Sequence, residues 1–106
     1  MDPRIERVGK NEAVFREVNE RINDVTHGDA AEYLCECGYA TCTETIQMTV
    51  ADYEGVRSDP THFALLPGHE LPDVEEVVER GDGFLVVQKH AGAAAALAAE
   101  LDPRSP

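Results

Sequence analysis

The sequence predicts an α+β fold, in which a long N-terminal helix packs on a small, mostly antiparallel sheet with a zinc knuckle and a C-terminal helix. Three observations support this prediction: a helical pattern over the first two dozen residues, short apolar segments between turn residues, and three closely spaced cysteines. A length of 106 residues predicts a single zinc-binding domain over residues 1–106, with 102–106 as a frayed tail.

The N-terminal helix is expected to begin at Asp2 and Pro3, an N-cap residue followed by a proline at the first helical position. A break near Gly9 is the alternative to one continuous helix, and Gly28 is the expected C-cap. Apolar residues at helical spacing predict the face that packs on the sheet: Val8, Phe15, Val18, Ile22 and Val25. Charged residues between them are expected on the other faces: Glu12, Arg16, Glu17, Glu20 and Arg21.

Five segments are expected to form strands because they are apolar or alternate in polarity and lie between turn residues: 31–34, 45–49, 62–66, 74–79 and 84–89. The last two flank a glycine turn and therefore predict a hairpin, with a helix over 73–80 as the alternative. A short helix capped by Thr49 is expected over 50–57. An alanine-rich helix is expected over 91–101.

The segment from Cys35 to Cys42 has the spacing C-x-C-x4-C. Cys35 and Cys37 project to the same side of an extended backbone, and thiolates are the soft ligands that Zn²⁺ takes in a tetrahedron. Gly38 is expected to turn the backbone with a positive φ, so that Cys42 returns to the metal. The alternative is three packed thiols without a metal. A disulfide is disfavoured because any bridge leaves one thiol over and a Cys35–Cys37 bridge is strained.

A fourth ligand has to come from elsewhere in the chain. His69 is the preferred candidate because the rigid Pro67 and the flexible Gly68 can aim its side chain after the strand ends. The alternatives are His62, His27, Glu36 and a water molecule.

The chain resembles a group of small bacterial proteins of about this length, typical of high-GC Gram-positive genomes, which have no established activity. The segments that carry the resemblance are Asn11-Glu12, Phe15 to Ile22, Cys35-Glu36-Cys37 with Cys42, Tyr53-Glu54, Val56-Arg57, Pro67-Gly68-His69, Val86-Val87 and Lys89. The resemblance implies that His69 belongs with the cysteines, and it implies no activity.

A zinc ion held by three Cys and one His has no open coordination position, so the site is expected to be structural. The expected role is a protein-interaction or regulatory module, with a redox- or zinc-sensing protein as the alternative. A zinc hydrolase or deaminase is disfavoured, because Cys42-Thr43-Glu44 supplies a glutamate close to a ligand but no P-C-x-x-C segment accompanies it.

The formal charge of −12 disfavours nucleic acid and anionic membrane surfaces as partners and favours a basic protein. Asn11 interrupts the heptad that Val18 and Val25 share, so a long coiled coil is not expected. The absence of a long apolar run and of a signal-peptide pattern predicts a cytoplasmic protein without a membrane segment, and the oligomeric state stays open.

Overall fold

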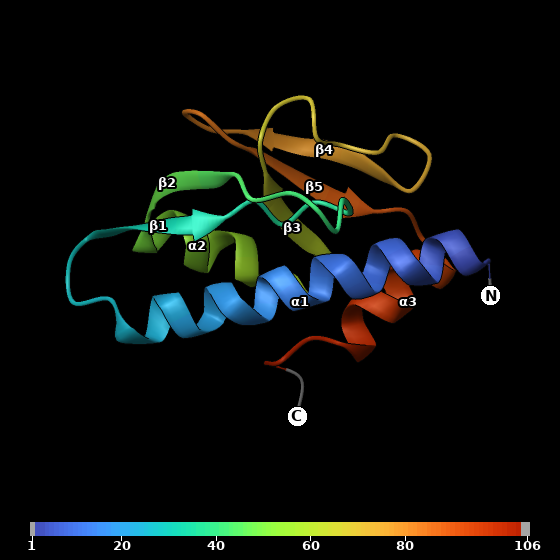
Figure 1. Cartoon of the computed structure of the whole chain (residues 1–106), viewed down its shortest axis with the longest axis horizontal. Helices are drawn as coiled ribbons and strands as arrows, with labels where there is room; N and C mark the ends of the chain where they lie inside the picture. The colour runs from blue at the N-terminus through green and yellow to red at the C-terminus, as the bar shows by residue number, and fades with distance from the viewer. Residues whose placement is uncertain (1, 105–106) are drawn as a thin grey trace.

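A computed structural model describes residues 2–104 and confirms the α+β fold, with a long N-terminal helix, small antiparallel sheets and a C-terminal helix (Figure 1). The elements of the described residues are, in order, α1 (Pro3–Val25), β1 (Ala30–Leu34), β2 (Thr45–Thr49), α2 (Val50–Arg57), β3 (His62–Leu65), β4 (Glu75–Arg80), β5 (Leu85–Lys89) and α3 (Ala93–Glu100).

The strands form two antiparallel sheets rather than one. Strands β1 and β2 pair with each other, and the other three pair in the order β3-β5-β4. The β4–β5 hairpin confirms the glycine-turn prediction over the helical alternative, and a bulge lies between Val77 and Glu79. Beyond the end of β1, the backbone N–H of Glu36 donates to the carbonyl of Ala64 in β3 at 2.8 Å. The segment that carries the first two cysteines therefore bridges the two sheets.

Helix α1 is continuous, capped by the Asp2 carboxylate, which accepts from the backbone N–H of Arg4 at 2.8 Å. The continuous helix is as predicted, and the alternative break near Gly9 is absent. Gly9 instead allows α3 to approach α1, because a Cβ there would lie 2.6 Å from Cδ2 of Leu97. The C-cap is Thr26, in an extended conformation, and not Gly28, which does not adopt a positive φ.

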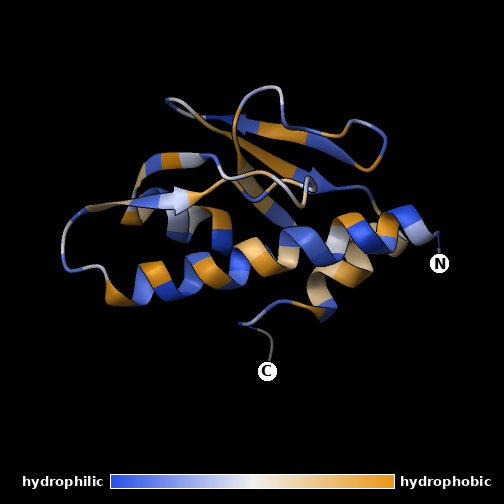
Figure 2. Cartoon of the chain, viewed as in Figure 1, coloured by the Kyte–Doolittle hydropathy of each residue, from blue (hydrophilic) through white to orange (hydrophobic). Residues whose placement is uncertain are grey.

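The face of α1 that packs on the fold differs from the predicted apolar stripe. Its buried residues are Val8, Gly9, Glu12, Arg16 and Asn19. Val14, Val18 and Val25 are 59%, 39% and 71% exposed. Figure 2 shows hydrophilic and hydrophobic residues mixed along α1, whereas β5 is largely hydrophobic. The helix therefore packs through polar groups whose partners lie elsewhere in the chain.

Two of these buried groups are ionisable and have specific partners. The Lys89 ammonium on β5 donates to Glu12 at 2.8 Å and to Glu75 at 2.9 Å, and all three side chains are almost fully buried. Arg16 donates to the carbonyls of Pro60 and Ala98, both at 2.8 Å, and its guanidinium lies 4.6 Å from the ring centroid of Phe63. These contacts offset the desolvation that would otherwise keep such groups at the surface.

The core lies between α1, α2 and the two sheets. Tyr33 of β1 stacks on Tyr53 of α2 with ring centroids 4.4 Å apart, and Phe63, Leu65 and Val87 fill the centre of the larger sheet. The predicted cap of α2 is present, since Thr49 Oγ1 accepts from the backbone N–H of Asp52 at 3.0 Å.

Part of the segment expected to fray is held against the body of the fold. Asp102 forms an ion pair with the buried Arg57, and Arg104 pairs with Glu20 at 2.8 Å and with Glu54 at 2.7 Å. The last two positions, 105–106, lie outside the described residues. Within residues 2–104, no helix is long and apolar enough to span a membrane.

Candidate metal centre

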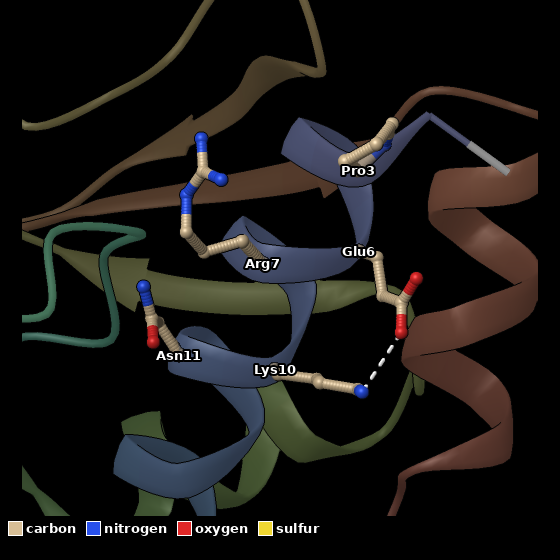
Figure 3. A pocket seen from close by; sticks show the side chains of 5 residues that line it. All are labelled: Pro3, Glu6, Arg7, Lys10 and Asn11. Carbon is tan, nitrogen blue, oxygen red and sulfur yellow. Dashed lines mark hydrogen bonds and ion pairs between the residues drawn. The ribbon is translucent and has the colours of Figure 1, made fainter.

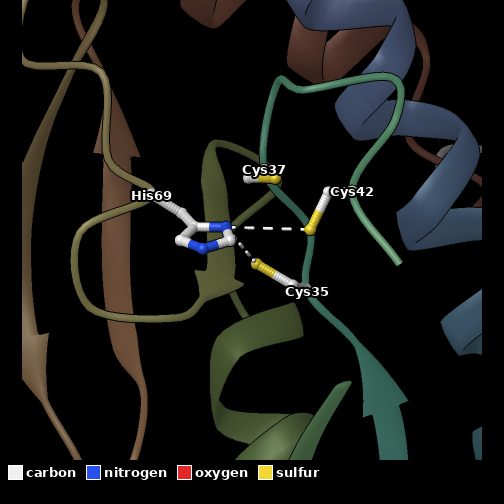
Figure 4. Close-up of side chains that lie close together, drawn as sticks. All are labelled: Cys35, Cys37, Cys42 and His69. Atoms are coloured by element: carbon white, nitrogen blue, oxygen red, sulfur yellow. Dashed lines mark hydrogen bonds between the residues drawn. The ribbon is translucent and has the colours of Figure 1, made fainter. Parts of the chain in front are cut away.

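Three neighbouring cysteines and one histidine that is distant in the sequence converge between the two sheets: Cys35, Cys37, Cys42 and His69 (Figure 4). One potential ligand atom from each lies within 4.8 Å of all the others. His69 Nδ1 is 3.5 Å from the sulfur of Cys35 and 3.7 Å from that of Cys42. The structure thus brings together the four residues that the sequence selected as metal ligands.

The cysteines are positioned by the chain that leaves β1. The backbone N–H of Cys35 donates to the carbonyl of Glu44 at 3.0 Å, which extends the β1–β2 ladder by one step. Cys37 follows on the same side of the extended segment. The N–H of Cys42 donates to the carbonyl of Tyr39 at 2.9 Å, so a tight turn folds the third sulfur back toward the first two.

His69 is positioned by the turn that ends β3. Its backbone N–H donates to the carbonyl of Leu66 at 3.0 Å, and Gly68 has a φ of 91°. Proline at the second position and a positive-φ glycine at the third are the features of a type II turn. This turn aims the imidazole at the cysteine segment, as the Pro67-Gly68 pattern indicated.

Gly38 acts differently from the prediction. It is not among the glycines with a positive φ, so the cysteine loop does not need its left-handed freedom. The space around it explains its presence instead: a Cβ at Gly38 would lie 2.6 Å from Cγ1 of Val8 and 3.0 Å from Cδ1 of Leu71. Glycine therefore lets the loop pack directly against α1.

Each sulfur accepts a hydrogen bond from a backbone N–H. Leu66 donates to Cys35 at 3.2 Å, Tyr39 donates to Cys37, and Glu44 donates to Cys42. Such bonds stabilise negative charge on sulfur, which is the form in which cysteine binds a metal.

The three thiols also share protons in the chain without metal. The hydrogen bond from the Cys35 thiol lowers the pKa of Cys37 to about 5, whereas that shared proton raises the pKa of Cys35, and burial raises it further. The lowered pKa of Cys37 favours its thiolate, the form in which cysteine binds a metal ion.

Two of the separations in the cluster fit a tetrahedral ion. Bonds of about 2.3 Å to sulfur and about 2.0–2.1 Å to nitrogen place the S and N corners of a tetrahedron about 3.6 Å apart. The separations of His69 Nδ1 from the sulfurs of Cys35 and Cys42, 3.5 and 3.7 Å, bracket that value. With all four ligand atoms within 4.8 Å of one another, the arrangement is compatible with a metal site.

The other candidate ligands lie outside this cluster. His62 is at the opposite end of β3, with Nε2 3.5 Å from Asp59, and His27 is exposed in the loop after α1. Glu36, between the first two cysteines, turns its carboxylate to the opposite side of the extended segment. It is fully buried there and accepts from Asn19 and Tyr53 at 2.9 Å and from the backbone N–H of Ala64 at 3.0 Å.

Sequence reasoning considered Glu36 only as a ligand and missed this anchoring role. The available signal was the alternation itself, because a residue between two inward-facing cysteines on an extended segment must face the other way.

Comparison of the chain with models of known protein families, with curated proteins and with solved structures gives no match. The cluster of three cysteines and one histidine is therefore the feature of the chain that bears on its function.

Proposed function

We propose that this is a small zinc protein in which Cys35, Cys37, Cys42 and His69 hold one structural Zn²⁺ ion. The approach of all four ligand atoms to within 4.8 Å carries the proposal, together with two Nδ1–Sγ separations that match the nitrogen–sulfur edge of a tetrahedral site. Soft thiolate ligands in that geometry favour zinc over the hard cations Mg²⁺ and Ca²⁺.

The same four donors argue against catalysis at the metal. A catalytic zinc ion keeps one position for water or substrate, whereas three Cys and one His fill all four. The proposed ion instead ties the end of β1 to the turn after β3 and so joins the two sheets.

Elemental analysis and cobalt substitution test the site. Protein purified without added metal should contain about one zinc per chain, and the Co²⁺ form should give the visible spectrum of a tetrahedral ion with sulfur ligands. The His69→Ala variant should shift that spectrum and weaken zinc binding, whereas His62→Ala should change neither. If His69→Ala leaves both unchanged, or if no transition metal binds after reconstitution, the proposed site is wrong.

We further propose that the rim of this site binds a basic protein. Tyr39 is 46% exposed and lies edge-on to His69, with ring centroids 6.1 Å apart. Glu44 and Glu70 follow Cys42 and His69 closely in the chain. An exposed aromatic ring beside carboxylates suits Lys and Arg side chains through cation–π and charge contacts.

Titration with a lysine-rich peptide, followed by NMR, tests this role. Binding should perturb the signals of Tyr39 and weaken in Tyr39→Ala, while an exposed substitution on another element, Glu79→Gln, should leave it unchanged. Equal binding by all three proteins would indicate general attraction to the charge of −12 rather than a site.

Redox sensing is a second candidate, favoured by the partial exposure of Cys42. In that case a peroxide oxidises two thiolates to a disulfide, is itself reduced to water, and the metal leaves. Release of zinc within minutes of adding dilute peroxide, reversed by a thiol reductant, would support this role. Retention of zinc under these conditions would exclude redox sensing, and the structural role would remain.

A further inference from the structure

The outer face of α1 carries a regular row of side chains. Its positions alternate in steps of four and three, the spacing of a coiled-coil seam: Arg7, Asn11, Val14, Val18, Arg21 and Val25. The three valines are exposed, whereas Asn11 is half-buried and contacts the loop that follows β1. The row is about 27 Å long at the rise of an α-helix.

The charged side chains of this face differ between its two ends. Six of the nine basic residues are buried, ion-paired to another element or on β4: Arg4, Arg16, Arg57, Arg80, Lys89 and Arg104. The other three, Arg7, Lys10 and Arg21, are exposed on α1, where Lys10 pairs with Glu6 at 2.8 Å and Arg21 lies 3.7 Å from Glu17. Glu6, Arg7 and Lys10 give the N-terminal half of the face a formal charge of +1, and Glu17, Arg21 and Asp24 give the second half a formal charge of −1. The face is thus neutral, with its positive end at the N-terminus.

A surface hollow lies at the positive end of the same face (Figure 3). Its lining residues are Pro3, Glu6, Arg7, Lys10 and Asn11. Figure 3 shows Arg7 and Asn11 to one side, and Lys10, bonded to Glu6 at 2.8 Å, to the other. At the other end of the row stands Val25, the most exposed of the three valines.

We propose that two copies of this chain pair through the outer faces of their α1 helices, antiparallel and around a twofold axis. In that arrangement Val14 of each copy meets Val18 of the other, and Val25 enters the hollow beside Arg7 of the other copy. Each contact occurs twice because the interface is isologous.

The opposite charges at the two ends of this face favour a second copy of the chain, in antiparallel orientation, as its partner. Pairing the helices head to tail brings Asp24 of each copy to Arg7 and Lys10 of the other, whereas parallel pairing would set cation against cation. The dipoles of the two helices also point in opposite directions in this orientation, which is electrostatically favourable. Asn11 does not prevent pairing, because its amide already donates to the Gly38 carbonyl at 3.0 Å, on the side of the helix next to the cysteine loop.

The length of the row sets the strength of the contact. Two helices that touch over about 27 Å bury less than roughly 1,200 Å², which is the range of weak and transient interfaces. The dimer should therefore dissociate with a constant on the order of tens of micromolar, and a dilute sample should be monomeric.

Analytical ultracentrifugation of the full chain over a range of concentrations tests the proposal. Wild-type protein should pass from monomer to dimer with rising concentration, and Val18→Glu should stay monomeric with an unchanged circular dichroism spectrum and melting curve, since Val18 is exposed. Lys10→Glu alone and Asp24→Lys alone should each weaken dimerisation roughly tenfold. The double variant, which exchanges the two charges, should restore it.

Arg80→Glu is the matched control, because it changes the net charge as Lys10→Glu does but lies on β4. It should leave dimerisation nearly unchanged. A wild-type chain that stays monomeric to millimolar concentration would refute the proposal, as would a dimer that Val18→Glu does not affect or a double variant weaker than either single one. If the chain stays monomeric and the NMR signals of the α1 valines change only when a helix of another protein is added, the face binds that protein and not a second copy.

Discussion

The carboxylate of Glu36 accepts a hydrogen bond from the side-chain amide of Asn19 at 2.9 Å, which joins the cysteine segment to the C-terminal half of α1. The Asn19 amide also donates to the Leu34 carbonyl, and its oxygen accepts from the Leu34 N–H at 2.7 Å. One asparagine therefore fixes both the last residue of β1 and the residue between two proposed ligands. The position of the site relative to α1 rests on these buried polar contacts.

Glu36→Leu is expected to destabilise the fold strongly. Three donors would lose their acceptor in a buried place, namely Asn19, Tyr53 and the backbone N–H of Ala64. At about 1–3 kcal/mol for each unsatisfied group, the free energy of unfolding should fall by about 3 kcal/mol or more. Denaturant unfolding measures this, with the exposed Glu32→Leu as the control. Equal effects of the two substitutions would contradict the anchoring role.

Gly38→Ala should destabilise the protein by about 1–3 kcal/mol, because its Cβ would press on Val8 and Leu71. Gly55→Ala is the control: Gly55 lies inside α2 with nothing within 4 Å of an added Cβ, so the same change there should stabilise by about 0.5–1 kcal/mol. Val8→Ala should recover part of the loss at Gly38. If Gly38→Ala proves neutral, close packing of the loop on α1 is not what requires glycine.

Removal of the metal should lower the melting temperature sharply. Structural zinc binding contributes to the free energy of folding, and in a chain of this size each kcal/mol shifts Tm by about 4–8 °C. We expect a strong chelator, and the Cys37→Ser variant, to lower Tm by about 20 °C or more, while Thr41→Ala in the same loop changes little. A melting curve that a chelator leaves unchanged would show a core independent of metal.

Glu12→Gln should change how stability depends on pH. Burial raises the pKa of Glu12 well above its usual value of 4.5; the nearby Lys89 lowers it in part, and Glu75 raises it. The folded chain therefore keeps a proton that the unfolded chain loses, and the stability gained from that proton disappears as pH rises above 4.5 through the folded pKa. As pH rises above 4.5, wild-type stability should fall relative to Glu12→Gln.

Urea unfolding at several pH values measures this difference. Glu17→Gln, at an exposed position of the same helix, should show a pH dependence parallel to that of the wild type. Parallel curves for wild type and Glu12→Gln would mean that Glu12 titrates as an ordinary carboxyl.

Much of the local structure followed from the sequence because local rules govern it. Asp2-Pro3 marks the start of α1, Thr49 caps α2, and the glycines after Arg80 turn the β4–β5 hairpin. The C-x-C-x4-C spacing and the Pro67-Gly68 turn also indicated which four side chains would meet, since both depend on a few adjacent residues. The role of these side chains as zinc ligands stays a prediction.

The tertiary structure alone decided which face of α1 is buried and how the site is anchored. Hydrophobic periodicity favoured Val18 and Val25, but Glu12 and Arg16 are the buried residues, and they bond to groups that are distant in the sequence. Lys89, for example, lies 77 positions from Glu12. No local sequence pattern predicts that a charged residue is buried. Its burial depends on partners that only the folded chain brings within hydrogen-bonding distance. The same holds for Gly38, whose lack of a side chain matters only because Val8 and Leu71 pack against it.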